Sequence, residues 1–63
     1  MKNFEYKVTS LELKVSEKNH EKKMQDDLNF YGKEGWELIQ IFEKTDILAS
    51  RRLIEFFFKR EIE

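Results

Sequence analysis

The side chains that could take part in catalysis or metal binding are few and form no recognisable motif. His20 is the only histidine of the 63 residues, and cysteine is absent. A transition-metal site would therefore depend on carboxylates, whereas such sites normally use several His or Cys ligands. Asp26 and Asp27 are adjacent in a segment with helical periodicity, so their carboxylates point in different directions and do not form a catalytic pair. We expect no enzymatic activity, no metal and no cofactor.

The stretch YGKEGWELIQIF (residues 31–42) is either a loop that presents its tryptophan to a ligand or the corner where a helix becomes a strand. It lacks the Gly-Lys-Ser/Thr sequence of a phosphate-binding loop, and a strand pattern follows it instead of a helix. We interpret Gly32 and Gly35 as structural, with Gly32 in the left-handed conformation that closes a helix. Large aromatic residues in small domains are mostly buried, so Trp36 is predicted to be a core residue.

Four basic residues suggest nucleic-acid binding as an alternative function. Arg51 and Arg52 lie beside a predicted turn, and Lys59 and Arg60 end the last predicted strand. Basic residues beside an aromatic sheet face can hold phosphates while bases stack on the rings. However, 12 basic residues face 13 acidic ones, and glutamates occur along the same strands, where they oppose a polyanion. Nucleic acid is therefore kept as the second hypothesis.

The first segment of the chain has the alternation of a half-buried strand. Apolar residues occupy even positions in FEYKV (residues 4–8) but odd positions in LELKV (residues 11–15). A flat strand through both segments would turn its apolar face over. We therefore expect a β-bulge or bend near residues 9–10, or an extended arm over the second segment.

A polar segment with one narrow apolar stripe follows at residues 16–31. The apolar residues at helical spacing are Met24, Leu28 and Tyr31. They predict an amphipathic helix that lies on another element and is not surrounded by the core. Ser16 or Asn19 is expected to cap its N-terminus, and Gly32 is expected to end it.

Two further strands are predicted in WELIQIFEK (residues 36–44) and LIEFFFKREI (residues 53–62), each with apolar residues on both faces. Because a short polar segment joins them, they should pair as an antiparallel hairpin. The predicted fold is α+β in β-α-β-β order, a three-stranded antiparallel sheet with one helix packed on one face. A chain this short forms a single domain, here residues 1–63.

One helix leaves the second face of the sheet without cover. If Trp36 and Leu38 lie beneath the helix, strand alternation places a second apolar set on the other face. This candidate oligomer interface consists of Ile39, Ile41, Leu53 and Phe57. Small domains usually need disulfides, a metal or a partner chain for stability, and the first two have no candidate residues here. We therefore expect a homo-oligomer, with a dimer favoured; the sequence points to no other particular protein partner.

The sequence MKNFEYKV has no apolar core of a signal peptide, and no later run approaches the ~18 apolar residues of a membrane helix. We therefore expect a cytoplasmic protein without a membrane partner.

The order of these segments resembles a known family. FEYKV, a polar helix, GKEGWELIQI and a phenylalanine-rich strand ending in FFKRE are similar to the DUF4177 family of small bacterial and phage proteins. The resemblance covers nearly the whole chain, and its most specific part is Gly-x-x-Gly-Trp-Glu-Leu with a terminal aromatic-Lys-Arg. It implies the β-α-β-β architecture, and it implies no activity, because the function of the family is unknown.

Overall fold

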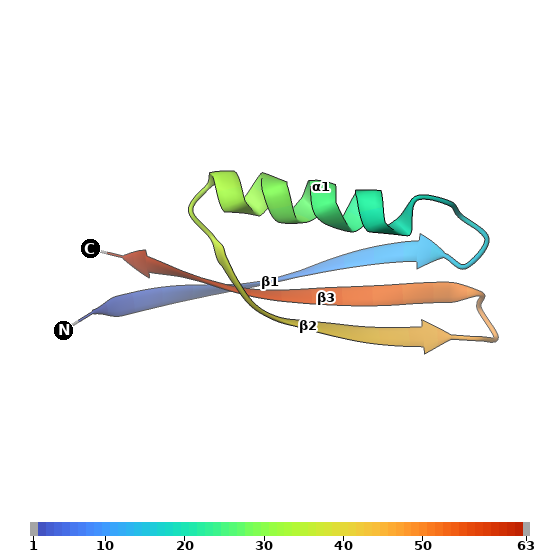
Figure 1. The fold of residues 1–63 in the computed structure, drawn as a ribbon. Coiled ribbons are helices and arrows are strands. Elements are labelled where there is room, and N and C mark those ends of the chain that lie inside the picture. The colour runs from blue at the N-terminus through green and yellow to red at the C-terminus, as the bar shows by residue number, and fades with distance from the viewer. Residues whose placement is uncertain (1, 63) are drawn as a thin grey trace.

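The structure is a computed structural model that describes residues 2–62. Its elements, in chain order, are β1 (Asn3–Lys14), α1 (His20–Lys33), β2 (Glu37–Asp46) and β3 (Arg51–Ile62). The three strands form one antiparallel sheet in the order β1-β3-β2, and α1 lies against one face of it (Figure 1). The predicted α+β fold in β-α-β-β order is confirmed, as is the pairing of the last two strands.

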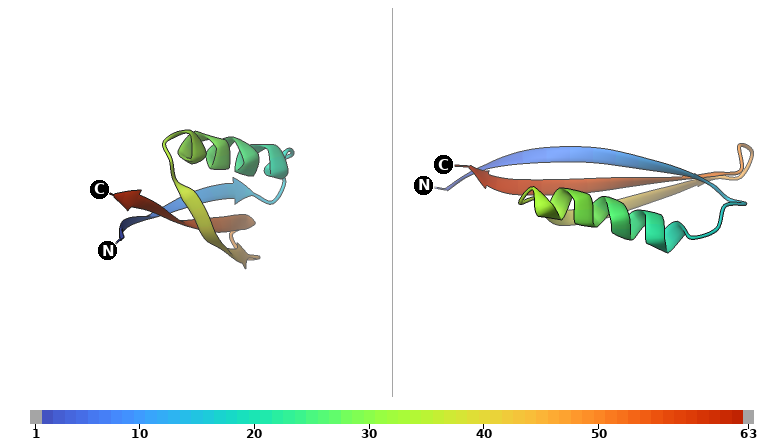
Figure 2. Two further views of the ribbon diagram at one scale, coloured as in Figure 1. Left: turned by 60° about the vertical axis from the view of Figure 1, so that its left-hand side comes forward. Right: turned by 90° about the horizontal axis from the view of Figure 1, so that it is seen from above.

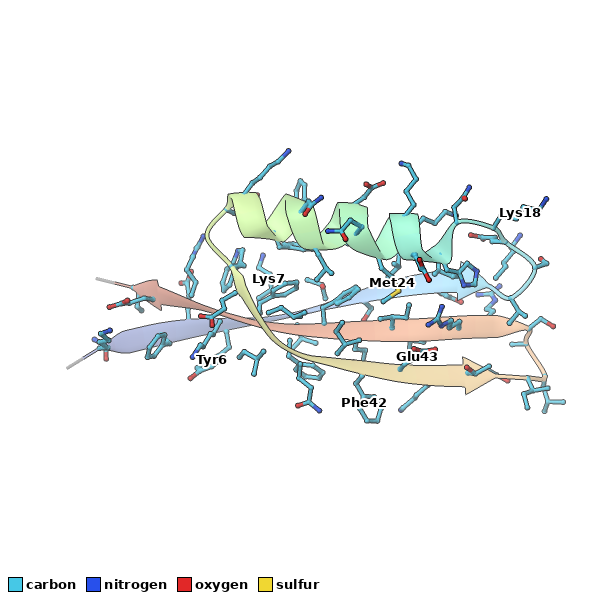
Figure 3. All side chains as sticks on the ribbon, viewed as in Figure 1. Tyr6, Lys7, Lys18, Met24, Phe42 and Glu43 are labelled. Carbon is cyan, nitrogen blue, oxygen red and sulfur yellow. The ribbon has the colours of Figure 1, made fainter. Side chains whose placement is uncertain are left out.

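Strand β1 is regular along its whole length. It pairs with β3 in one unbroken register from Asn3 to Lys14. The predicted bulge or bend near residues 9–10, and the alternative of an extended arm, are therefore wrong. The apolar side of β1 does turn over. The odd-numbered Leu13 is buried in the core beneath α1, whereas the even-numbered Tyr6 faces away from the helix (Figure 3). One strand therefore contributes to both faces of the sheet.

The irregularity lies in β2 instead. Its register with β3 shifts between Leu38 and Gln40, so Ile39 is an extra residue in the strand. A bulge exchanges the faces of all residues beyond it. Ile41 consequently pairs with the fully buried Phe56 on the helix side. The predicted placement of Ile41 on the uncovered face is wrong, because it assumed strict alternation through this point.

The core lies between α1 and the sheet. Its buried residues are Leu13, Trp36, Ile54, Phe56 and Phe58, and the half-buried residues packed against them are Leu11, Met24, Leu28 and Tyr31. The predicted apolar stripe of the helix therefore faces the sheet. Trp36 is a core residue, as predicted, and is only 9% exposed.

A Schellman motif closes the corner between α1 and β2. The amide of Gly35 donates to the carbonyl of Gly32 at 3.0 Å, and that of Trp36 donates to the carbonyl of Tyr31 at 3.1 Å. Gly35 takes the left-handed conformation, with φ +89°. The prediction of a positive φ at Gly32 is wrong, because the helix continues through this residue to Lys33. The motif turns the chain so that Trp36 enters the core.

The N-terminus of α1 is held without a capping side chain. Asn19 occupies the cap position in a left-handed conformation with φ 65°, and no side chain caps the helix. Asn19, one of the two expected cap residues, therefore occupies the cap position, but the side-chain hydrogen bond expected of it is absent. Instead, the His20 ring bonds through Nε2 to the carbonyl of Lys14 at 3.0 Å, which ties the first turn to the end of β1.

Candidate interaction surface

The sheet face that α1 does not cover is called the open face here. It is formed by even residues of β1, odd residues of β3, and the even residues of β2 that follow the bulge. Its apolar side chains are Phe4, Tyr6, Val8, Phe42, Leu53 and Phe57. The helix lies on the other side of the sheet (Figures 1 and 2), and Tyr6 and Phe42 project away from it (Figure 3). Tyr6 is 69% exposed and Val8 56% exposed, so this face presents apolar surface to solvent.

Phe57 lies at the centre of the open face. It is on the middle strand, opposite Val8 of β1 and Gln40 of β2, and it is half-buried by these neighbours. Leu53 lies four residues away on the same strand and the same face. Two of the four predicted interface residues therefore occupy the open face, while Ile39 lies in the bulge and is 51% exposed.

The pairing of β1 and β2 with β3 shows which open-face residues the prediction missed. These are Phe4, Tyr6, Val8 and Phe42. The signal for the first three was present in FEYKV, but it was interpreted as the core side of a bent strand. The signal for Phe42 was hidden, because an unrecognised bulge at Ile39 reverses the faces beyond it.

Two charged residues flank Phe57 on the same face. Lys59 and Glu55 lie two positions to either side of it on β3, and both are half-buried. The Lys59 ammonium lies 5.0 Å from the ring centroid of Phe4. Among residues 2–62, neither side chain forms an ion pair.

A shallow hollow of about 560 Å³ lies at the hairpin end of the open face. Leu53 forms part of its floor, and Ile47 and Leu48 of the β2–β3 turn line its rim. These two turn residues are 84% and 99% exposed, so the hollow is open to solvent, and charged side chains of Glu12, Lys44, Asp46 and Arg51 also line it.

The arginines proposed for nucleic-acid contact bind carboxylates of their own chain. Arg51 forms an ion pair with Glu12. Arg52 binds Glu43 through two nitrogens, one of them at 2.9 Å, and its Nη1 lies 3.2 Å from Nδ1 of His20. The hydrogen bond from Arg52 lowers the pKa of the Glu43 carboxyl and raises the pKa of the arginine itself. The Arg52 contacts fasten the start of α1 to the sheet.

Arg60 fastens the other end of the helix. Its Nε donates to Glu5 at 2.8 Å, its Nη1 donates to the carbonyl of Glu34 at 2.7 Å, and its guanidinium lies 4.2 Å from the ring centroid of Trp36. It therefore stabilises the corner that delivers Trp36 to the core. The four predicted nucleic-acid residues do not converge: the arginines at positions 51 and 52 lie at the hairpin end of β3, and Lys59 lies with Arg60 near its other end.

A family model matches residues 4–61, which include almost the whole of the sheet and all of the helix. It is described as a domain of unknown function, DUF4177. The chain belongs to the DUF4177 family. The resemblance seen in the sequence is thereby confirmed, and membership assigns no activity to this DUF4177 protein. The comparisons with curated proteins and with solved structures gave no significant match.

Residues 2–62 of the DUF4177 chain contain neither a cluster of metal ligands nor a membrane-spanning helix. Over residues 2–62 no group of three or more His, Cys, Asp or Glu side chains could hold a metal ion. Both ring nitrogens of His20 have protein partners, the carbonyl of Lys14 and the guanidinium of Arg52. None of the described helices has the length and apolar character needed to span a membrane.

Proposed function

We propose that this DUF4177 protein is a non-enzymatic module that acts by binding a second copy of itself through the open face. The observation that carries the proposal is the set of apolar side chains on this face, centred on Phe57, that no element of the described chain covers. Contiguous apolar surface of several hundred Å² on a small protein marks an interaction site. A two-fold partner presents the same surface in return, so that one interface covers both copies.

The dimensions of the molecule support a dimer of this kind. Its two longer extents are 46 and 19 Å, and its shortest is 11 Å. One broad face therefore approaches the ~800 Å² that each partner contributes to a stable protein–protein interface. A slab this thin has a large surface for its core, which makes the gain from covering one face correspondingly large. The cytoplasm stays the expected location.

Nucleic acid is the weaker hypothesis on these contacts. The open face has aromatic rings, but Arg51, Arg52 and Arg60 already bind carboxylates of their own chain. Phosphate binding would have to replace these ion pairs. Glu55 lies beside Phe57 at the centre of the face and repels a polyanion.

Sedimentation equilibrium at micromolar concentrations tests the proposal. The wild-type protein is expected to be a dimer, and Phe57→Glu is expected to sediment as a monomer. Circular dichroism measures how much of the folded structure this monomer retains. Phe30→Glu is the matched control, because Phe30 is a 59% exposed aromatic residue on the helix and lies outside the open face. This control should remain dimeric.

A wild-type protein that stays monomeric throughout this range would refute the proposal. A fluorescence titration with generic DNA and RNA tests the second hypothesis in parallel. Tight binding that weakens steeply with salt would favour nucleic acid, because phosphate contacts release counterions.

A further inference from the structure

The open face has a charge pattern that is complementary to itself. On β3, Lys59 lies two residues to one side of Phe57 and Glu55 lies two residues to the other. Residues two apart on a strand share a face and are separated by roughly 7 Å. Along the middle strand, a positive and a negative side chain therefore lie at equal distances on either side of Phe57.

Any partner that covers the open face must satisfy these two charges. Lys59 and Glu55 are already half-buried, and neither has an ion-pair partner within residues 2–62. Covering them removes the water that solvates them, and the cost is offset only where an opposite charge lies close by. A second copy carries the required charges, but it presents them at the right positions in only one orientation.

When the strands of the two sheets stay nearly aligned, a two-fold axis in the plane between them runs either along the strands or across them. An axis parallel to the strands sets Lys59 of one copy against Lys59 of the other, and Glu55 against Glu55, which is repulsive. An axis that runs across the strands at Phe57 reverses the strand direction. Each Lys59 then meets Glu55 of the other copy, and the pair forms twice.

We propose that two copies pack through their open faces about a two-fold axis that crosses the strands at Phe57, with reciprocal Lys59–Glu55 ion pairs. The inference rests on the proposed self-association and specifies its orientation. Packed antiparallel sheets keep their strands within about 30° of each other, so residues this close to the axis remain opposite one another.

The same orientation places a ring over the hairpin hollow. Phe4 lies opposite Glu61, four residues beyond Phe57 on β3, and Leu53 lies four residues before it. Reversal about Phe57 keeps β1 over β1, so Phe4 of one copy comes to lie over Glu12 of the other, the β1 neighbour of Leu53. There the hollow rimmed by Ile47 and Leu48 can receive an aromatic ring.

Charge reversal tests the orientation. Lys59→Glu and Glu55→Lys should each weaken self-association about tenfold or more, because each change places like charges together twice. An equimolar mixture of the two variants should associate to within about threefold of wild type, since every like pair becomes an opposite pair in the heterodimer. Sedimentation velocity with one variant fluorescently labelled measures all three affinities.

The controls are Lys18→Glu and Glu21→Lys, two exposed residues beside and within the first turn of α1. Alone or mixed they should leave the affinity unchanged, which excludes an effect of net charge. An axis parallel to the strands predicts a different result: each single variant would match wild type, and the mixture would bind more tightly than wild type. That result would overturn the proposed orientation.

Failure of this inference is distinguishable from failure of the proposed function. If Phe57→Glu abolishes association but both charge variants bind like wild type, the orientation is wrong and self-association through the open face stands. If the wild-type protein does not associate, the proposed function fails and the orientation fails with it.

Discussion

The two faces of the sheet are built by the same three strands, yet only one of them is covered within the described chain. Phe56 and Phe57 are adjacent on β3; the first is fully buried beneath α1, and the second is half-buried on the open face. Both faces carry several aromatic side chains. The difference arises because one helix can cover only one face of a sheet, so an apolar second face needs cover from another source.

The charges of the two faces differ in the same way. On the helix side, Arg52 and Arg60 bind Glu43 and Glu5 and fasten opposite ends of the α1 region to the sheet. On the covered face the two arginines are thus paired within the chain, and the Lys7 ammonium lies over the Tyr31 and Trp36 rings. At the centre of the open face, Lys59 and Glu55 form no ion pair within residues 2–62.

The largest expected effect is a loss of stability when a core residue of the covered face is truncated. Phe56→Ala removes a fully buried ring and should lower the free energy of unfolding by about 3–5 kcal/mol, which is enough to unfold a domain of this size. Phe57→Ala should instead make the unfolding midpoint independent of protein concentration, because it weakens association and leaves the core in place. Thermal unfolding at two protein concentrations, followed by circular dichroism, measures both effects.

The two substitutions should therefore have different effects: Phe56→Ala lowers the stability of the fold, and Phe57→Ala weakens self-association. If Phe56→Ala unfolds with a midpoint near that of wild type, the core assignment is wrong. If the unfolding midpoint of Phe57→Ala depends on protein concentration as that of wild type does, Phe57 does not mediate self-association, and the assignment of the open face as the interface is wrong.

The sequence predicted the elements and their order well, because the apolar stripe of the helix and the alternation of the strands are local signals. Met24, Leu28 and Tyr31 are spaced by the helical repeat, and the structure turns them toward the sheet. The buried tryptophan was predicted for a similar reason, since Gly35-Trp36 marks the exit from a helix into a strand.

The assignment of faces was less predictable, because a one-residue irregularity reverses every later side chain. The shift of parity between FEYKV and LELKV suggested a bulge in β1, but there the strand is regular and both faces receive apolar residues. The real bulge, at Ile39, lies within the apolar run LIQIF, where alternation gives no warning. The position of this bulge is determined by the pairing of β2 with β3, a contact between residues far apart in the sequence.

A smaller effect tests how the chain enters the covered face. Gly35→Ala should destabilise the protein by roughly 1–2 kcal/mol, because φ +89° is unfavourable for a residue with a Cβ. The new Cβ would lie 3.4 Å from Cδ of Arg60, an ordinary contact, so backbone strain is the main cost. Gly32→Ala should have the opposite sign and stabilise by about 0.5–1 kcal/mol, since a Cβ on this helical glycine would have no neighbour within 4 Å.

Urea unfolding of the two variants under identical conditions compares the glycines directly. Because neither residue lies on the open face, both variants should retain the dissociation constant of wild type after correction for the folded fraction. Equal shifts of the same sign would contradict the assignment of the Schellman motif to this corner.

The smallest expected effect concerns the ion pair that fastens the start of α1. The hydrogen bond from Arg52 holds the pKa of Glu43 below its ordinary value of 4.5, so the folded state favours the charged carboxylate. A lowered pKa in the folded state stabilises the protein above pH 4.5, and the contribution is lost as the pH falls through the folded-state value. Glu43→Gln should therefore reduce the loss of stability between about pH 7 and about pH 3.

The Glu43→Gln variant should still lose some stability at low pH. Protonation of Glu17 contributes to this loss, because the hydrogen bond from Lys23 lowers the pKa of its carboxyl in the folded state. Hydrogen exchange of the first turn of α1 gives the local measurement, because the Glu43–Arg52 pair reaches the helix through His20. In the wild-type protein, amides near His20 should lose protection against exchange at low pH, while amides of β3 beneath the helix remain protected. If Glu43→Gln and wild type lose stability equally on acidification, the ion pair does not contribute to holding the helix on the covered face.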